Sequence, residues 1–551
     1  MSSHRLVLFE GRSLSLRIFF ITLLTLLFIR LIYVQVYDSN FLDRTSENRI
    51  TAKYSINAPR GSILDRNGKY LALDVESYTL QVDLENFDPT PKKISSVLHI
   101  LREDEKNFAN KIRNKKGFIQ VKRHLTLKEK IEIERLGIKG ISLLRDLKRS
   151  YPQGEISAHA VGITDIDRNG LQGAEKLFDN YMKSTSGSFN GSKDRVGNKL
   201  YGIRVEPERG RNINMTLDIR IQSIAYNELR SSVLNHGAKS GSIILVDPIS
   251  SEILAMANYP SFEPSNRKEL SDFSLLRNRS AIDLFQPGSV IKPIAMAAVI
   301  DFNNYDVSKI IDTSPGWIDF GGYRTEDYRD YGELTLSEII ARSSNVGMVK
   351  LCSKVEKGFI YEYLGKFGIG SYPASILINT REGFLSYTDA VTPRDKVSAC
   401  YGYGMSVTSI HLAQAYSILA SNGIYKELTL FKNNEEMPYF IESKRVLSEE
   451  TVNFINETLY QAVNSNFGTA KRARIKAISV SGKTGTVENI ENNKQVYSAI
   501  FAGFAPSKKP KIVAIVSLHG LEGEIHSGSS VAAPLFSRVM EQSLHTINSG
   551  I

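Results

Sequence analysis

The stretch Gln286-Pro-Gly-Ser-Val-Ile-Lys-Pro-Ile-Ala-Met-Ala-Ala-Val-Ile300 decides the interpretation of the fold. Its apolar residues leave no polar face, which predicts a helix over Ser289–Ile300 that is buried on all sides. Ser289 and Lys292 are three residues apart, so a helix places both side chains on one face, one turn apart. A serine hydroxyl becomes a good nucleophile only beside a base, and a lysine becomes a base when burial and a second cation disfavour its charge. The stretch therefore predicts a buried helix with a candidate nucleophile at its start.

This serine and lysine pattern is weak evidence by itself. Roughly two Ser-x-x-Lys matches are expected by chance in a chain of this composition. A second match, Ser265-Asn-Arg-Lys268, follows a proline-containing turn and precedes no apolar helix, so we interpret it as a chance match. Taken alone, Ser289 is also compatible with a simple helix N-cap.

Two further patterns follow in the chain. Ser343-Ser-Asn345 lies between a helix that a Thr335-x-x-Glu338 capping box opens and an apolar run, so it is expected on a turn. Lys483-Thr-Gly485-Thr486 lies within a predicted strand, where a glycine often marks close approach of another backbone. Each pattern also has a purely structural interpretation. Ser343 and Asn345 are compatible with simple helix capping, and Lys483 with a lysine that protects an edge strand against aggregation. In combination, the three patterns are the set that penicillin-binding proteins and serine β-lactamases share.

Five strands are predicted around this helix. Ser242–Val246 and Glu252–Asn258 flank an Asp247-Pro248 turn, and three more strands close the chain before a last helix, Ala532–His545. These three are Ala477–Val487, Tyr497–Phe504 and Lys511–Leu518. Helices between a strand pair and a strand trio predict an α+β fold, an antiparallel sheet that helices cover on both faces.

The N-terminal region contains the one long apolar segment, Leu14–Val36. Its length suits a membrane span, and no small-x-small cleavage site follows it, which favours an uncleaved signal anchor over a signal peptide. Arg5, Arg12 and Arg17 precede or begin the span, so we expect the N-terminus in the cytoplasm and the rest outside. The expected organisation is a cytoplasmic tail (1–13), a transmembrane anchor (14–36), a mixed pedestal domain (37–215) and a catalytic domain (216–546).

Charge and cysteine content exclude several classes of protein. The net charge of +10 reflects a mixed basic and acidic region, Lys106–Arg149, that we interpret as a solvated face without a nucleic-acid-binding pattern. The two cysteines, Cys352 and Cys400, and nine histidines show no metal-ligand spacing, so neither a metal nor a cofactor is expected. The sequence leaves the oxidation state of the cysteines open.

With these patterns in order, the chain resembles the class B penicillin-binding proteins, particularly the division-specific transpeptidase of Gram-negative type. The resemblance covers nearly the whole chain. It also includes patterns of the pedestal and catalytic domains: Arg60-Gly61 with Asp65-Arg-Asn-Gly68, Tyr151-Pro152, Gly170-Leu-Gln-Gly173 with Glu175, Val246-Asp-Pro248, Tyr401-Gly-Tyr-Gly404 and Ala502-Gly-Phe-Ala-Pro506. Two positions depart from the family pattern, Gln286 where glutamate is more common and Ser409 where proline is usual.

The resemblance implies a role for each matching residue. Ser289 is the expected nucleophile toward a D-Ala-D-Ala stem pentapeptide or a β-lactam, and Lys292 is its base. Ser343 is expected to pass a proton to the leaving amine, and Asn345 to hold the acyl amide. Lys483 would supply positive potential, with Thr484, Gly485 and Thr486 along the substrate. The backbone N–H groups of Ser289 and Thr486 would form the oxyanion hole.

The resemblance also implies a cellular role. The expected activity is septal cross-linking in the inner membrane, with the catalytic domain in the periplasm at the division septum. No glycosyltransferase-sized region precedes the pedestal, so a membrane glycan polymerase and other division proteins are the expected partners. An elongation-type transpeptidase, a membrane-anchored β-lactam sensor or β-lactamase, and a non-catalytic scaffold remain alternatives. The acceptor residue, the oligomeric state and the affinity for β-lactams are not predicted.

Overall fold

The structure is a computed structural model of the chain, and it describes residues 10–37, 51–113, 115–193, 199–373, 380–386, 392–432, 443–491 and 493–549. The chain divides into two compact units, Met1–Pro59 with Ser184–Arg209, and Arg60–Lys183 with Gly210–Ile551. Residues 1–9 of the predicted cytoplasmic tail lie outside the described part.

The first unit contains the predicted span and a small sheet. Helix α1 (Glu10–Ile32) continues into a π-helical turn, Tyr33–Tyr37. The segment Leu14–Val36 within it is long and apolar enough to cross a membrane. The sheet is antiparallel in the order β1-β6-β7, formed by β1 (Thr51–Ile56), β6 (Gly187–Lys193) and β7 (Lys199–Val205).

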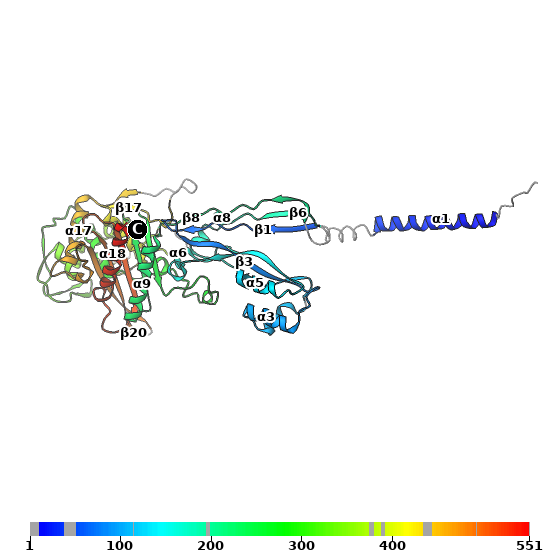
Figure 1. Cartoon of the computed structure of the whole chain (residues 1–551). Helices are drawn as coiled ribbons and strands as arrows, with labels where there is room; N and C mark the ends of the chain where they lie inside the picture. The colour runs from blue at the N-terminus through cyan, green and yellow to red at the C-terminus, as the bar shows by residue number, and fades with distance from the viewer. Residues whose placement is uncertain are drawn as a thin grey trace, which may run out of the picture. The chain divides into compact units, whose positions relative to one another are not determined.

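In the second unit, the part that precedes residue 184 is built around the long strand β3 (Tyr70–Asp83). Strand β3 pairs antiparallel with β2 (Ile63–Leu64), β4 (Phe118–Leu125) and β5 (Ile141–Ser150). The predicted Asn67-Gly68 turn joins β2 to β3, and Gly68 adopts the positive φ of 79° that this turn requires. Alternating residues of β3 face a small core under three helices (Figure 1): α3 (Pro91–Leu101), α4 (Glu105–Ile112) and α5 (Leu127–Arg135).

A buried ion-pair network secures the start of this unit. Arg60 and Arg149 both pair with Glu175, at 2.8 and 2.6 Å, and the Glu175 side chain is fully buried. Arg149 and Arg168 both pair with Asp74, at 3.1 and 2.6 Å. Because buried charges are costly without partners, the segments that carry these five residues must keep their mutual positions. Glu175 lies on the short helix α7 (Gly173–Leu177), which is followed by a second short helix, α8 (Asp179–Met182).

The catalytic half is an antiparallel sheet in the order β10-β9-β21-β20-β19. All five predicted strands are present, with bounds shifted by a few residues: β9 (Ser240–Val246), β10 (Ile253–Tyr259), β19 (Ser481–Glu491), β20 (Lys494–Ala505) and β21 (Ile512–Leu521). Along β9, Ile243 and Leu245 enter one core while Ile244 and Val246 enter the other. Strands buried on both faces require cover on both, which confirms the predicted α+β class.

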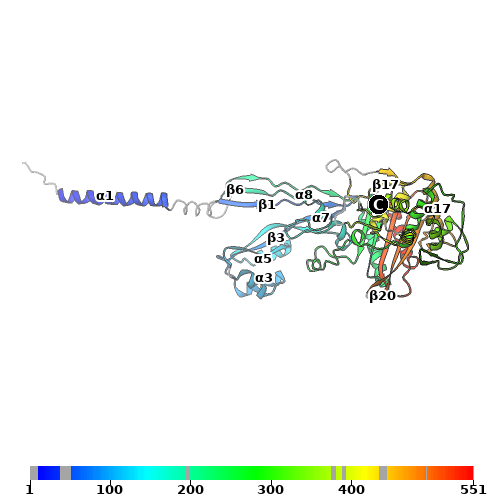
Figure 2. The ribbon, with the colours of Figure 1, turned by 180° about the vertical axis from the view of Figure 1, so that it is seen from behind.

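Helices cover both faces of this sheet. One face packs against α9 (Ile219–His236) and α18 (Ala533–Ser549), which lie together beside β20 in Figure 1. Figure 2 shows the same half from behind, with β20 and α17 labelled. The other face packs against α16 (Ser409–Ala420), every residue of which is buried, and α11 (Lys292–Asp301). Ser409, one of the departures from the family pattern, begins α16, and its hydroxyl bonds the hydroxyls of Ser242 and Ser517 on the sheet.

A further group of elements completes the catalytic half. Its strands are β11 (Ile310–Asp312), β12 (Trp317–Phe320), β13 (Tyr323–Glu326), β14 (Glu333–Thr335), β15 (Phe384–Leu385), β16 (Met405–Ser406), β17 (Ile424–Lys426) and β18 (Ser443–Arg445). Its helices are α12 (Leu336–Arg342), α13 (Asn345–Cys352), α14 (Lys357–Lys366), α15 (Pro393–Ala399) and α17 (Glu449–Asn464).

Candidate active site

The predicted helix over Ser289–Ile300 has a different first turn. Residues Gly288–Ile291 (η4) form a 3-10 helix, and the α-helix α11 begins only at Lys292. A 3-10 helix has three residues per turn, so side chains three apart eclipse each other, and Ser289 lies in line with Lys292. Tyr416, fully buried on α16, donates a hydrogen bond to the Val290 carbonyl at 2.8 Å and so holds this turn. Among the described residues, the Ser289 hydroxyl has no hydrogen-bond partner in this structure.

Lys292 is fully buried behind Ser289. Its Nζ donates to the Ser343 carbonyl and to Asn345 Oδ1, both at 2.7 Å. Burial lowers the pKa of Lys292 to about 7, and the nearby Asp327 carboxylate partly opposes that shift. A neutral amine has two N–H donors, which the two oxygens use, and one lone pair that remains available to accept a proton. The site therefore holds an amine suited to act as a base near neutral pH.

The turn Ser343-Ser-Asn345 presents its groups to this amine. The predicted Thr335–Glu338 capping box is present, and α12 runs from it to end at Ser343, which has φ 63° and ψ 38°. A serine rarely adopts this left-handed conformation, and here it turns the Ser343 carbonyl toward Lys292. Asn345 Nδ2 donates to the Glu326 carbonyl at 3.0 Å, which directs its Oδ1 toward Lys292.

Lys483 enters the same site from strand β19. It is fully buried, and its Nζ donates to Ser343 Oγ at 2.9 Å and to the Thr484 carbonyl at 3.0 Å. Lys292 Nζ lies 3.3 Å from the same hydroxyl. Burial and the proximity of Lys292 both lower the pKa of Lys483 well below its usual value. The Ser343 hydroxyl thus joins the two lysines.

Strand β19 forms the other side of the site. It is at the edge of its sheet, so within the described residues no strand pairs with its outer side. A Cβ on Gly485 would lie 3.0 Å from the Pro287 carbonyl and 3.1 Å from a Val290 methyl. The strand therefore passes directly beside the turn Gly288–Ile291, called the nucleophile turn below. Thr486 is exposed, and its hydroxyl accepts a hydrogen bond from the Gly528 N–H at 2.9 Å. The free edge can receive an extended peptide.

The eight predicted residues are therefore brought to one place. Helix, turn and strand converge at Ser343 Oγ, and Gly485 places Thr484 and Thr486 beside the Ser289 turn. Ser265 and Lys268, the chance match, lie elsewhere on exposed turns.

Comparisons with known proteins identify two domains in this chain. Residues 241–541 match the model of the penicillin binding protein transpeptidase domain, and residues 55–215 match that of the penicillin-binding protein dimerisation domain. This chain belongs to the penicillin-binding proteins. The two domains together are those of a class B penicillin-binding protein.

Individual relatives cover almost the whole length. The chain is 31% identical to the probable peptidoglycan D,D-transpeptidase PbpC of Pseudomonas aeruginosa, over 94% of this chain and 92% of that protein. It is 30% identical to the peptidoglycan D,D-transpeptidase FtsI of Escherichia coli, over 94% and 89%. Its fold matches penicillin binding protein 3 of Mycobacterium tuberculosis, crystallised with aztreonam, with a TM-score of 0.69, 24% identity and coverage of 90% and 97%.

One functional residue of this penicillin-binding protein was not predicted from the sequence. Asp327, which follows β13, accepts hydrogen bonds from the Ser344 hydroxyl and the Asn345 N–H, both at 2.5 Å, and from the Val346 N–H at 3.0 Å. A carboxylate at the N-terminus of α13 stabilises that helix and its first residue, Asn345. Asp327 is 16 residues before Ser343, and no local pattern in the sequence connects the two.

We predict that Asp327→Asn lowers the pKa of Lys292 to below 7, because it removes the negative charge that opposes the effect of burial. Loss of the carboxylate at the helix N-terminus should also cost about 1 kcal/mol of stability. Both effects are measurable, by ¹³C-lysine NMR titration assigned with Lys292→Met and by thermal unfolding. Asp319→Asn, an exposed carboxylate on β12, is the matched control. An unchanged Lys292 pKa in Asp327→Asn would remove Asp327 from this role.

Proposed function

We propose that this protein is a septal peptidoglycan D,D-transpeptidase that acts through an acyl-enzyme on Ser289. The observation that carries the proposal is the convergence of Lys292 and Lys483 on the Ser343 hydroxyl, close to the Ser289 hydroxyl, which accepts and donates no hydrogen bond within the described part of the chain. The names of its relatives, which describe D,D-transpeptidases, support the same reaction.

In the acylation step, Ser289 Oγ attacks the carbonyl of the penultimate D-Ala, and Lys292 accepts the hydroxyl proton. The tetrahedral oxyanion is stabilised by the backbone N–H groups of Ser289 and Thr486, which lie on the adjacent turn and strand. Collapse of this intermediate breaks the peptide bond and expels the terminal D-Ala. The leaving amine takes its proton through the Ser343 hydroxyl, which contacts Lys292, and the Asn345 amide is placed to hold the acyl group.

The terminal carboxylate of the substrate couples substrate binding to the protonation state of Lys292. Lys483, Thr484 and Thr486 are the groups on β19 that can receive it. A bound carboxylate would raise the pKa of Lys483 and favour its charged form. A charged Lys483 in turn disfavours a charged Lys292, since two cations around one hydroxyl repel each other. Substrate binding would therefore keep Lys292 in the neutral form that acts as a base.

The acyl group then passes to an amine of a neighbouring stem peptide. That amine attacks the Ser289 ester and loses a proton to Lys292. The ester C–O bond then breaks, the new peptide bond of the cross-link remains, and Lys292 returns the proton to Ser289 Oγ. A β-lactam would follow the first half of this sequence and leave a stable ester, because it lacks a departing amine that diffuses away.

The setting of the reaction follows from the anchor. A span at Leu14–Val36 with arginines on its N-terminal side would place the catalytic domain in the periplasm of a Gram-negative cell. A disulfide between Cys352 and Cys400 is compatible with that oxidising compartment. We assign the protein to the septum with a membrane glycan polymerase and further division proteins as partners, since an FtsI relative matches along nearly the whole chain.

Labelling with a fluorescent penicillin tests the acyl-enzyme. We predict one covalent adduct on the wild-type protein, located on Ser289 by peptide mapping, and none on Ser289→Ala. Lys292→Met should fold but label at least about 100-fold more slowly, because it lacks the base. Ser265→Ala, from the chance match, is the control and should label like wild type. Labelling of Ser289→Ala would refute the assignment, and rapid turnover of the adduct would favour a β-lactamase.

Depletion of the protein in its native cell tests the septal role. We predict long undivided cells and a fluorescent fusion at mid-cell, with loss of function in a Ser289→Ala strain. Round or swollen cells would instead identify an elongation enzyme. Normal growth of the Ser289→Ala strain would identify a non-catalytic scaffold.

A further inference from the structure

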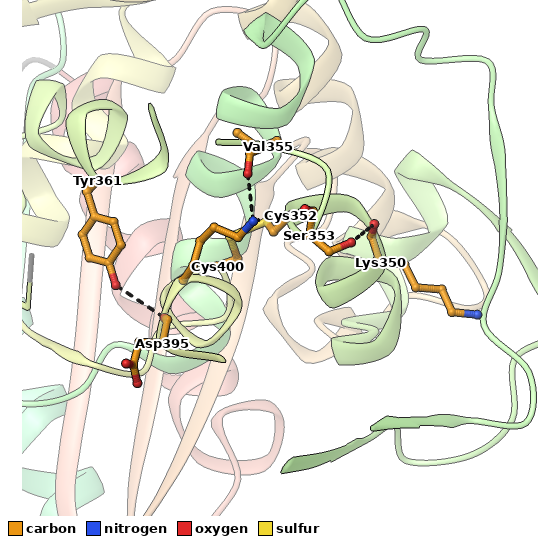
Figure 3. Close-up of a disulfide and its surroundings, with 8 residues drawn as sticks. Lys350, Cys352, Ser353, Val355, Tyr361, Asp395 and Cys400 are labelled. Carbon is orange, nitrogen blue, oxygen red and sulfur yellow. Dashed lines mark hydrogen bonds between the residues drawn. A yellow bond between two sulfur atoms is a disulfide. The ribbon is translucent and has the colours of Figure 1, made fainter. Parts of the chain in front are cut away.

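The disulfide Cys352–Cys400 joins two segments of the catalytic half that are 48 residues apart in sequence. Cys352 is the last residue of α13, and Cys400 directly follows α15. Both cysteines are fully buried. Figure 3 shows the disulfide where these two segments meet.

One end of the disulfide leads to the base. Helix α13 has eight residues and begins at Asn345, whose Oδ1 accepts a hydrogen bond from Lys292 at 2.7 Å. A short helix buried on most of its faces moves as a rigid body. Any displacement of Cys352 along or around the helix axis would therefore displace Asn345 and its contact with Lys292.

The other end of the disulfide leads to the nucleophile. Two residues after Cys400, the Gly402 carbonyl accepts a hydrogen bond from the Gly288 N–H at 3.2 Å. The contact is so close that a Cβ on Gly402, which has φ 91°, would lie 2.1 Å from the Gly288 carbonyl oxygen. Gly288 directly precedes Ser289. The position of the nucleophile turn thus depends on the position of the turn that follows Cys400.

These contacts form a closed ring. It runs from Ser289 to Lys292 along one helix, to Asn345, down α13 to Cys352, across the disulfide to Cys400, and through Gly402 to Gly288. We infer that the disulfide is a positioning element of the active site, which sets the distance between the Ser289 nucleophile and the groups that hold Lys292. This inference rests on the proposed function.

A single lysine reinforces the same junction. Lys396, on α15, donates hydrogen bonds to the carbonyls of Ser353 and Val355, at 3.1 and 2.9 Å, just beyond the end of α13. Burial lowers the pKa of Lys396. Without the disulfide, α15 would hold the end of α13 mainly through these hydrogen bonds and through packing.

The disulfide must form before the catalytic domain has folded around the two cysteines. A donor disulfide of a periplasmic thiol–disulfide oxidoreductase is attacked by the thiolate of one cysteine, which gives a mixed disulfide. The second cysteine then attacks that sulfur, and the donor leaves as a dithiol with the two electrons and two protons of the cysteine pair. Because both sulfurs are buried in the folded protein, this exchange requires an open chain. The folded enzyme should accordingly resist reduction.

The test compares the same chain with and without the bond. Wild-type protein is reduced in denaturant and refolded with reductant, and its acylation by fluorescent penicillin is measured at 20 °C beside the disulfide form. We expect the dithiol form to be acylated at least about 10-fold more slowly, because small displacements of reacting groups lower the reaction rate strongly. We also expect its pH profile to shift, since the contact between Lys292 and Asn345 is altered.

A stability control separates positioning from unfolding. Val539→Ala, in the buried face of α18 on the opposite side of the sheet, should lower the melting temperature without changing the acylation rate constant.

If the dithiol form has the same acylation rate and pH profile as the disulfide form, the bond only stabilises the fold and the inference is wrong. If it cannot refold, Cys352→Ala with Cys400→Ala replaces it, and failure of both to fold at 15 °C would also overturn the inference. Absence of labelling in the disulfide form would instead refute the proposed function.

Discussion

Two lysine side chains around one buried hydroxyl are the interaction on which the site depends. Lys292 and Lys483 come from a helix and a strand that are almost two hundred residues apart, and both are fully removed from solvent. Their ammonium groups cannot both be charged at low cost, because burial and mutual repulsion each disfavour the charge. The fold therefore has to supply a neutral amine at this point, and it does so through carbonyl oxygens that suit N–H donors rather than through carboxylates in direct contact.

This arrangement is costly to the protein. A fall in the pKa of Lys292 from 10.5 to about 7 corresponds to on the order of 5 kcal/mol at neutral pH relative to an exposed lysine. The surrounding structure offsets that cost with rigid supports. These include the Tyr416 hydrogen bond to the nucleophile turn, the left-handed Ser343, and the Asp327 carboxylate at the start of α13. A site assembled in this way has little freedom to rearrange when a substrate binds.

The sequence predicted the parts of this site that short spacings encode. Ser289 and Lys292, the Ser343–Asn345 turn and the strand around Lys483 each carry a local signal, and the alternating and continuous apolar runs placed them on helix, turn and strand. The 3-10 geometry of the first turn was not predicted, because it depends on contacts of Gly288 with Gly402 and Val487 from distant segments. Asp327 and the Cys352–Cys400 pairing were not predicted for the same reason. Each joins residues whose proximity only the tertiary fold creates.

The pH dependence of acylation tests the central claim most directly. The second-order rate constant for reaction of a fluorescent penicillin with the protein is measured from about pH 5.5 to about pH 10.5. Protonation of Lys292 removes the base, so the account predicts a rate constant that rises with pH through a midpoint near 7, the pKa of the buried amine. A rate constant that does not change over this range, or one that rises only toward pH 10, would show that no neutral buried lysine activates Ser289.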